Sequence, residues 1–318
     1  MLLSSLWLGL CRVWGEVYSS VYLFGGIKSV KGVSFPKGGI LYTGIQELIL
    51  TDDLMANLYN GSYVNNELFL NQYLIIKDSS GNVVDTGRWT EKGFTKLKYK
   101  PINNDYFGKI SPRNQEQTFA FDALENDSIT GVLLTGGFGS GKTMCSLVYA
   151  IDQITRQTPK YDRIVYLRNN YDVFNTISVG ALPGNLNEKL APYAMSLADI
   201  LGSVTQLNLL ISTEKIVLDH IGFIRGRSFK NSLVLLSEAQ NTSREIMALI
   251  VARIGTGSRL IVEGDVRQCD KEVFAKNSGI YYLAESLRGD PEFAMITLKK
   301  NERSRFASLS DKILGIEE

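Results

Sequence analysis

The sequence predicts an α/β fold in which a parallel sheet flanked by helices follows a small β-rich domain. After Pro101, short apolar runs alternate with helical patterns of about 10 to 15 residues, which is typical of parallel sheets. The runs read GVLLTG, RIVYLR, KIVLDH, NSLVLLSE and SRLIVEGD. Their continuous apolar character indicates strands buried on both faces, joined by right-handed crossovers.

The chain has 318 residues, which suggests two domains at roughly 100 to 200 residues each. We assign residues 39–105 to the small β-rich domain and residues 106–318 to the α/β domain, and we leave residues 1–38 unassigned. In the first domain, NQYLIIK, VVDTGRW and FTKLKY predict a small meander. Before it, TGIQELILTDDLMANLY predicts a strand and then a helix that begins at Asp52 or Asp53.

Composition excludes several classes of function. The 34 Lys and Arg residues nearly balance the 33 Asp and Glu residues, so any site for a polyanion must be a local patch. One histidine and three scattered cysteines exclude His-rich metal sites and favour a reducing cytoplasm. The apolar start, MLLSSLWLGLC, is shorter than the roughly 20 residues of a membrane span. We therefore expect a cytoplasmic protein without a membrane partner.

The most specific motif is the glycine-rich loop GGFGSGKT, between the run GVLLT and the helical pattern MCSLVYAIDQI. Such a loop aims backbone N–H groups at phosphate oxygens, so the α/β domain is expected to be a RecA-like P-loop NTPase domain. Lys142 is expected to bridge the β- and γ-phosphates of ATP, and the Thr143 hydroxyl to ligate Mg²⁺. The residues expected to bind the nucleotide here are Gly136, Gly137, Phe138, Gly139, Ser140, Gly141, Lys142 and Thr143.

Two later runs end in polar residues that suit a P-loop site. Glu238 follows LVLL and is expected to orient the attacking water. The residue before it, where a Mg²⁺-binding carboxylate is usual, is Ser237, so Ser237→Asp is expected to raise turnover. In GDVRQ, Asp265 is a candidate metal ligand and Gln268 a candidate sensor of the γ-phosphate. The alternative for Asp265 is a helix N-cap or turn residue.

Two amides precede the P-loop run, in SPRNQEQTFAFDAL. Asn114 and Gln117 stand in the spacing NxxQ just before a helical pattern. This resembles the adenine-reading amide of helicase-like ATPases, because an amide can both donate to and accept from the adenine edge. The alternative is a polar helix N-terminus.

The order of these motifs resembles that of the PhoH-like ATPases, relatives of superfamily 1 helicases. The resemblance covers residues 111–314 and includes PRNQEQ, GGFGSGKT, LPGNLNEKLAPY, LVLLSEAQN, RLIVEGDVRQCD and NERS. It implies an ATPase that uses ATP and Mg²⁺, acts on RNA as a candidate helicase, and forms a homo-oligomeric ring such as a hexamer. It also makes Arg303, in NERS, a candidate arginine finger; the alternative is a surface arginine paired with Glu302 or Asp311.

Other parts of the chain add three expectations. The stretch YTGIQELILTDD resembles the linker of longer family members that carry a PIN ribonuclease, whereas residues 1–40 contain a single acidic residue. A nuclease is therefore expected only as a partner in trans. Arg225 and Arg227, in IRGRSF, are expected to contact RNA; alternatively they pair with the nucleotide or an acidic neighbour. The alternative function is a hydrolysis-poor, ATP-binding assembly module, which Ser237 favours.

Overall fold

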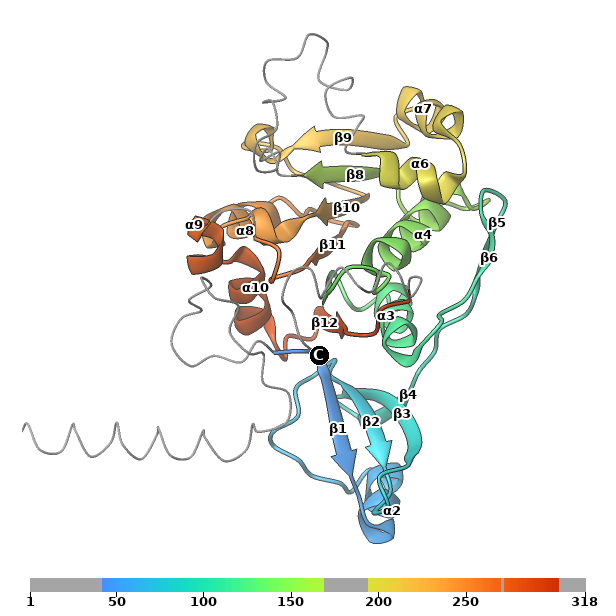
Figure 1. Ribbon diagram of the computed structural model, residues 1–318, viewed down its shortest axis with the longest axis vertical. Coiled ribbons are helices and arrows are strands. Elements are labelled where there is room, and N and C mark those ends of the chain that lie inside the picture. Colours follow the sequence, from blue (N-terminus) through green and yellow to red (C-terminus); the bar gives the residue numbers. More distant parts are fainter. Residues whose placement is uncertain (1–41, 169–193, 270–271, 303–318) are drawn as a thin grey trace, which may run out of the picture. The chain divides into compact units, whose positions relative to one another are not determined.

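A computed structural model describes residues 42–168, 194–269 and 272–302 of the chain (Figure 1). Residues 1–38 and the candidate arginine finger Arg303 lie outside the described residues.

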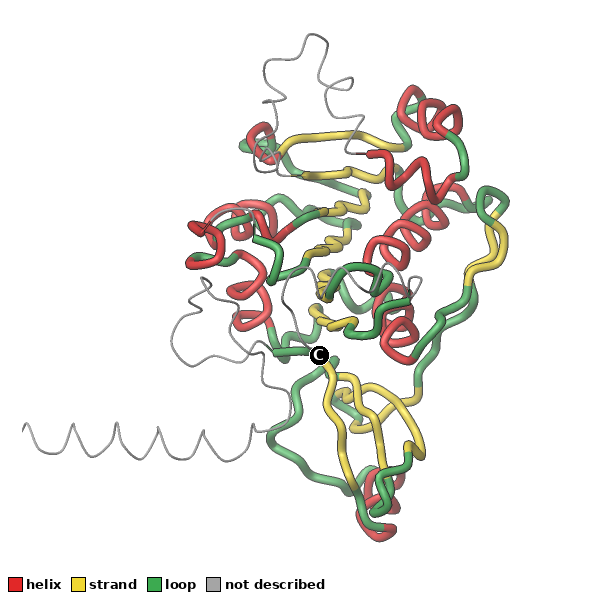
Figure 2. The backbone as a smooth tube through the Cα atoms, viewed as in Figure 1, coloured by secondary structure: helices red, strands yellow, loops and turns green. Residues whose placement is uncertain are grey.

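A six-stranded sheet forms the centre of the α/β domain (Figure 2). Its strands are β7 (Gly131–Gly136), β8 (Arg163–Arg168), β9 (Ile216–His220), β10 (Ser232–Ser237), β11 (Arg259–Gly264) and β12 (Phe293–Leu298). They pair in the order β12-β7-β11-β10-β8-β9, and every pair is parallel. The predicted parallel sheet is thus confirmed. Five strands match the predicted runs, and β12 is an additional edge strand that the sequence analysis does not identify.

Helices cover both faces of this sheet (Figure 1). The helices are α3 (Gln115–Glu125), α4 (Lys142–Thr155), α6 (Met195–Leu201), α7 (Val204–Ser212), α8 (Arg244–Val251), α9 (Glu272–Lys276) and α10 (Gly279–Leu287), with 3-10 turns η3 (Ile221–Phe223) and η4 (Ala239–Asn241). Successive side chains of a strand point to opposite faces. Val132 and Leu134 of β7 accordingly pack with α3 and α4, whereas Leu133 packs with α8 and α10. Continuously apolar strands fold here because both faces are buried.

The smaller sheet lies before the α/β domain in the chain. Its elements are β1 (Ile45–Ile49), α2 (Asp52–Asn60), β2 (Tyr73–Lys77), β3 (Val83–Thr90) and β4 (Gly93–Lys96), followed by the hairpin of β5 (Ile102–Asn104) and β6 (Gly108–Ile110). The strands β2, β3 and β4 form an antiparallel meander, as predicted. The helix α2 begins at Asp52 and lies between β1 and β2 in the chain, so that β2 can pair parallel to β1. The proposed domain boundary at residue 105 falls in the turn between β5 and β6.

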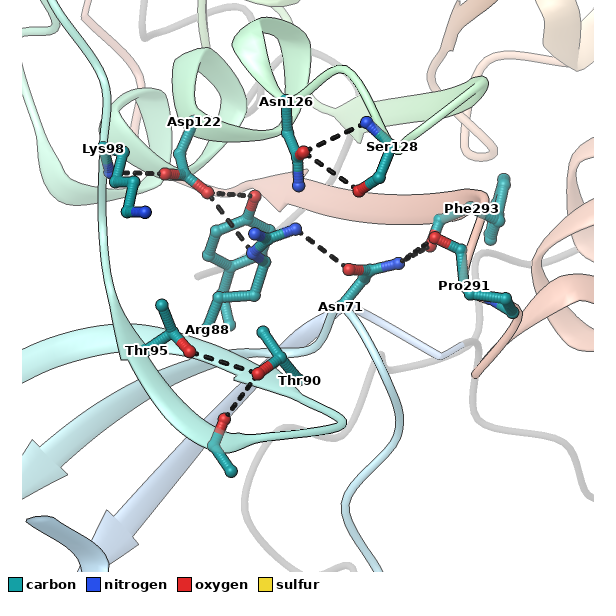
Figure 3. A network of polar contacts seen from close by, with 12 residues as sticks. Asn71, Arg88, Thr90, Thr95, Lys98, Asp122, Asn126, Ser128, Pro291 and Phe293 are labelled. Carbon is teal, nitrogen blue, oxygen red and sulfur yellow. Dashed lines mark hydrogen bonds and ion pairs between the residues drawn. The ribbon is translucent and has the colours of Figure 1, made fainter. Parts of the chain in front are cut away.

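A buried polar network joins this smaller sheet to the α/β domain (Figure 3). The Nδ2 of Asn71 donates to the backbone oxygens of Pro291 and Phe293, at 2.9 and 3.1 Å. Its Oδ1 accepts a hydrogen bond of 3.0 Å from Nη1 of Arg88, whose Nε lies 3.6 Å from Oδ2 of Asp122 on α3. Each buried polar group left without a partner would cost about 1–3 kcal/mol. The network therefore holds the smaller sheet against α3 and β12.

The helices of the described residues are short. No single helix in these ranges is long and apolar enough to cross a membrane. The helices α6 and α7 meet that description only when taken together, and the pair is bent by 112°.

Candidate nucleotide-binding site

The glycine-rich loop connects the carboxyl end of β7 to the first turn of α4. Gly136, Gly139 and Gly141 have φ angles of 146°, 72° and 95°, values that L side chains rarely adopt. A Cβ atom on Gly136 would lie 2.0 Å from the backbone oxygen of Leu298. Glycine at these positions therefore permits both the turn and the close approach to β12. The loop ends at Gly141, the N-cap of α4, so the free N–H groups of that helix point into the loop.

Lys142 is the first residue of α4, and its ammonium lies within the loop. The Nζ atom donates to the backbone oxygens of Gly136 and Gly137, at 2.7 and 2.9 Å. Burial lowers the pKa of this ammonium, and the neighbouring carboxylates of Asp265 and Glu263 oppose that shift. The ammonium therefore lies where a P-loop lysine meets phosphates.

A cavity of about 690 Å³ opens over this loop, within the size range of small-molecule sites. It lies at the carboxyl ends of the parallel strands β7, β10 and β11, where ligands of open α/β sheets bind. Its lining comprises Lys109, Ile110, Ser111, Arg113, Gln117, Phe138, Gly139, Gly141, Lys142, Thr143, Met144, Ser237, Glu238, Glu263, Gly264, Asp265, Gln268 and Glu302. The structure therefore brings the P-loop motif together with the polar residues expected after two later strands.

Three residues of the motif support the loop rather than line the cavity. The backbone oxygens of Gly136 and Gly137 hold the Lys142 ammonium. The buried Ser140 donates from its hydroxyl to the backbone oxygen of Gly137 at 3.0 Å. These contacts fix the shape of the loop from within.

Glu238 follows β10 and reaches the cavity from a strained backbone. Its φ and ψ are 55° and 43°, in the left-handed region that a glutamate rarely occupies. Its Oε1 lies 3.9 Å from Nη2 of Arg168, and its Oε2 accepts a hydrogen bond of 2.6 Å from Gln240. Strain of this kind, of the order of 1–3 kcal/mol, persists where the surroundings impose it and often marks functional sites.

Asp265 and Gln268 meet directly at the other side of the cavity. The Nε2 of Gln268 donates to Oδ2 of Asp265 at 2.6 Å. The backbone N–H and the Nε of Arg267 also donate to Asp265, at 3.0 and 3.1 Å. These contacts place Asp265 in a turn after β11, which is the alternative role stated for it in the sequence analysis. Its charge is balanced by Arg267. The metal and sensor roles of this pair stay predictions.

The two amides before the P-loop are engaged with the protein. Asn114 is the N-cap of α3, where its Oδ1 accepts from the N–H of Gln117, and its Nδ2 donates to Glu302. The side chain of Gln117 accepts from the N–H of Arg113 at 2.9 Å and donates to the backbone oxygen of Ser140 at 3.1 Å. In this structure both amides brace the loop and the helix. Gln117 also lines the cavity, so an adenine contact stays a prediction.

Arg225 and Arg227 lie beyond η3, outside the cavity lining. Arg227 forms an ion pair with the buried Asp219 and lies over the ring of Phe229, at 5.2 Å from its centroid. This matches the alternative in which the arginine pairs with an acidic neighbour. Arg225 is exposed.

Glu263 is a site residue that the sequence analysis missed. Its side chain is 2 % exposed, at the end of β11, and lines the cavity beside Ser237. Burial raises the pKa of this carboxyl, and hydrogen bonds from the hydroxyls of Ser146 and Ser237 oppose the shift. The sequence does contain a signal for this residue. Glu263 is the one acidic residue in the apolar run RLIVEG, and a buried charge requires partners.

The oxygen donors of this cavity suit Mg²⁺. They are the hydroxyl of Thr143 and the carboxylates around it, all hard ligands. Within the described residues, no group of three or more His, Cys, Asp or Glu side chains is arranged to hold a metal by itself. Mg²⁺ usually binds through one or two protein ligands together with substrate phosphates and water, so the donor set fits a cation that arrives with a nucleotide.

Comparisons with known proteins agree with this geometry. The family model for the PhoH-like protein matches residues 109–316. Protein PhoH2 of Bacillus subtilis (strain 168) is 28% identical over 288 residues, which is 86% of this chain and 64% of that protein. Protein PhoH2 of Thermobispora bispora is 30% identical over 283 residues, covering 86% of this chain and 63% of that protein. Protein PhoH of Escherichia coli (strain K12) is 32% identical over 166 residues, covering 51% and 45%.

The chain spans less than two thirds of the length of these curated relatives. The family match covers most of the α/β domain, including the loop, Glu238 and Asp265. The resemblance to the PhoH-like family is thereby confirmed. The chain belongs to the PhoH-like family, a family of P-loop ATPase-like proteins.

Proposed function

We propose that this protein binds ATP with Mg²⁺ in the cavity over the loop 136–143 and hydrolyses it. The observation that carries the proposal is the convergence of the Lys142 ammonium, the N-terminus of α4 and the Glu238 carboxylate on one cavity. The first two groups attract and orient phosphates, and the third is a base that can hold a water.

Different parts of the cavity would bind different parts of the nucleotide. The backbone N–H groups of the loop and Lys142 bind the phosphate chain, while Ile110 and Arg113 offer an apolar and a planar cationic surface to the base. Glu238 accepts a hydrogen bond from the attacking water and orients it toward the γ-phosphate. Mg²⁺, held by Thr143 and phosphate oxygens, would neutralise phosphate charge when it is bound.

A steady-state assay of phosphate release from ATP, with Mg²⁺ or with EDTA, tests the proposal. We expect saturable release that requires Mg²⁺. ATP binding without measurable release would instead support the assembly module, which the serine at position 237 favours. Absence of both binding and release would contradict the proposal.

We also propose that the protein acts on RNA. The support is the family resemblance together with the exposed Arg225, because guanidinium groups pair well with phosphates. The net charge of +1 limits such binding to a local patch.

The two arginines near η3 are expected to respond differently to mutation. Arg225→Ala should weaken RNA binding and reduce the slope of log affinity against log salt by about one, as one phosphate contact does. Arg227→Ala should instead lower stability, because Asp219 would be left buried without its ion-pair partner. Fluorescence anisotropy with labelled single-stranded RNA at several salt concentrations, plus thermal unfolding, measures both. An unchanged slope for Arg225→Ala would exclude that residue from RNA contact.

We further propose a homo-oligomeric ring in which Arg303 reaches the nucleotide of a neighbouring subunit. Mixing two inactive variants tests this. Glu238→Gln subunits retain Arg303, and Arg303→Ala subunits retain a complete cavity, so mixed rings should regain part of the ATPase activity. A monomer in light scattering, or a mixture as inactive as its components, would contradict the ring.

A further inference from the structure

Ser237 and Glu263 are neighbours on adjacent strands at the edge of the nucleotide cavity. The register pairs Leu236 of β10 with Val262 of β11, so the next residue on each strand is Ser237 and Glu263. The Ser237 hydroxyl donates to Oε1 of Glu263 at 2.9 Å. Both residues line the cavity that contains Lys142 and Thr143. The end of β10 therefore lacks the usual carboxylate, and the adjacent strand β11 carries one, Glu263, beside Ser237.

The environment of the Glu263 carboxylate is unusual for a buried acid. Its Oε2 accepts a second hydrogen bond, of 2.8 Å, from the Ser146 hydroxyl on α4. Among the described residues it has no Lys or Arg nitrogen within 4.0 Å, so its close partners are neutral hydroxyls. The Lys142 ammonium acts on this carboxylate from farther away, without forming an ion pair. A buried charge whose direct partners are neutral is costly, and a cation on the cavity side would compensate for it.

Ser237 can transmit this charge to the cavity. A serine hydroxyl has one hydrogen to donate and two lone pairs to accept with. The Ser237 hydroxyl also has a hydrogen bond with the side chain of Tyr166. Because the hydrogen of Ser237 is directed to Glu263, Tyr166 takes up one lone pair and the second remains for a water or a cation. Charge-assisted hydrogen bonds of this kind are about twice as strong as neutral ones.

We infer that Glu263 is the acidic positioning residue of the metal-nucleotide site, and that it acts through Ser237 in place of a carboxylate on β10. The inference rests on the proposed binding of ATP with Mg²⁺. Glu263 and Ser237 form one unit: the carboxylate supplies the charge, and the hydroxyl presents an oxygen to the hydration shell of the cation beside Thr143.

This assignment reverses the expectation from sequence for Ser237→Asp. An aspartate at position 237 would face the Glu263 carboxylate across the contact that now measures 2.9 Å. Two carboxylates at that separation cannot both be charged without a large penalty. The single variant should therefore bind Mg²⁺ no better than the natural protein. Exchange of the two residues, Ser237→Asp with Glu263→Ser, restores one carboxylate and one hydroxyl and should bind Mg²⁺ well.

Nucleotide affinity measured during a Mg²⁺ titration tests the inference without relying on turnover. The probe is a fluorescent ATP analogue, bound at equilibrium to the full chain in EDTA and at rising Mg²⁺ concentrations. For Glu263→Gln we expect nucleotide binding in EDTA at least as tight as in the natural protein. The Mg²⁺ concentration for half-maximal enhancement should rise roughly 10- to 100-fold, as for the loss of other groups that orient metal ligands. The exchanged pair should return to within about threefold of the natural protein.

The outcomes separate this inference from the proposed function. If the natural protein binds no nucleotide with or without Mg²⁺, the proposed function fails and this inference fails with it. If the natural protein binds nucleotide with Mg²⁺-dependent affinity, and the titration curve of folded Glu263→Gln superimposes on that of the natural protein, the proposed function stands and the role of Glu263 is structural. Should Glu263→Gln not fold, by circular dichroism, the exchanged pair decides: a folded variant without Mg²⁺ dependence overturns the inference.

Discussion

Replacement of Glu238 by glutamine is expected to lower ATP turnover by about 10²- to 10⁴-fold, the usual contribution of a positioned acid or base. Glutamine keeps the size of the side chain and can still meet Gln240, but it cannot accept a proton from the attacking water. ATP affinity should change little, because the phosphates are bound by the loop and Lys142 rather than by this carboxylate. The measurement is kcat from phosphate release, with equilibrium binding of ATP in parallel.

A matched control for this variant is Glu245→Gln. Glu245 lies in the first turn of α8, outside the cavity lining, and accepts a hydrogen bond from Asn277. It should retain full activity. A Glu238→Gln protein with natural kcat would show that another group orients the water.

Replacement of Arg259 by methionine is expected to lower the free energy of unfolding by about 2–4 kcal/mol. Arg259 begins β11 and is 2 % exposed. It donates to the backbone oxygens of Leu124 and Asn126 at the carboxyl end of α3, and to the Tyr149 hydroxyl at 2.7 Å. Each buried carbonyl that loses its donor costs about 1–3 kcal/mol, and the favourable charge at the helix end is lost as well.

Urea denaturation measures this loss, with Arg163→Met as the control. Arg163 is also the first residue of a parallel strand, but its side chain is 43% exposed and lies 3.8 Å from an exposed glutamate. An exposed pair of this kind contributes about 0–1 kcal/mol. Equal destabilisation by the two substitutions would show that the contacts of Arg259 do not stabilise the end of α3.

The features predicted from sequence are those that local patterns determine. Apolar runs and the GxxxxGKT spacing define the buried strands and the loop of the α/β domain, because strand burial and glycine geometry act over a few residues. The helix start at Asp52 and the meander after it are likewise local. The edge strand β12 carries the same local signal, the apolar run FAMITL, and was missed although the motif NERS follows it.

The features missed depend on which strands become neighbours. Ser237 and Glu263 are 26 positions apart, and their contact exists because β11 lies between β7 and β10. The identity of Ser237 alone does not indicate which neighbouring strand places a carboxylate beside it. For Gln117, the sequence identified an amide near the nucleotide, whereas its partner in this structure is the backbone of Ser140, a tertiary contact.

The most direct test of the account is calorimetric titration of ATP with Mg²⁺ into the natural protein and into Lys142→Ala. Lys215→Ala is the control, because that ammonium is exposed and meets the backbone of Asp162. A hydrogen bond from a charged group contributes about 1.5–3 kcal/mol, so the loss of Lys142 should weaken ATP binding roughly 10- to 100-fold. Lys215→Ala should match the natural protein. Equal ATP affinity in Lys142→Ala and the natural protein would contradict nucleotide binding at this loop.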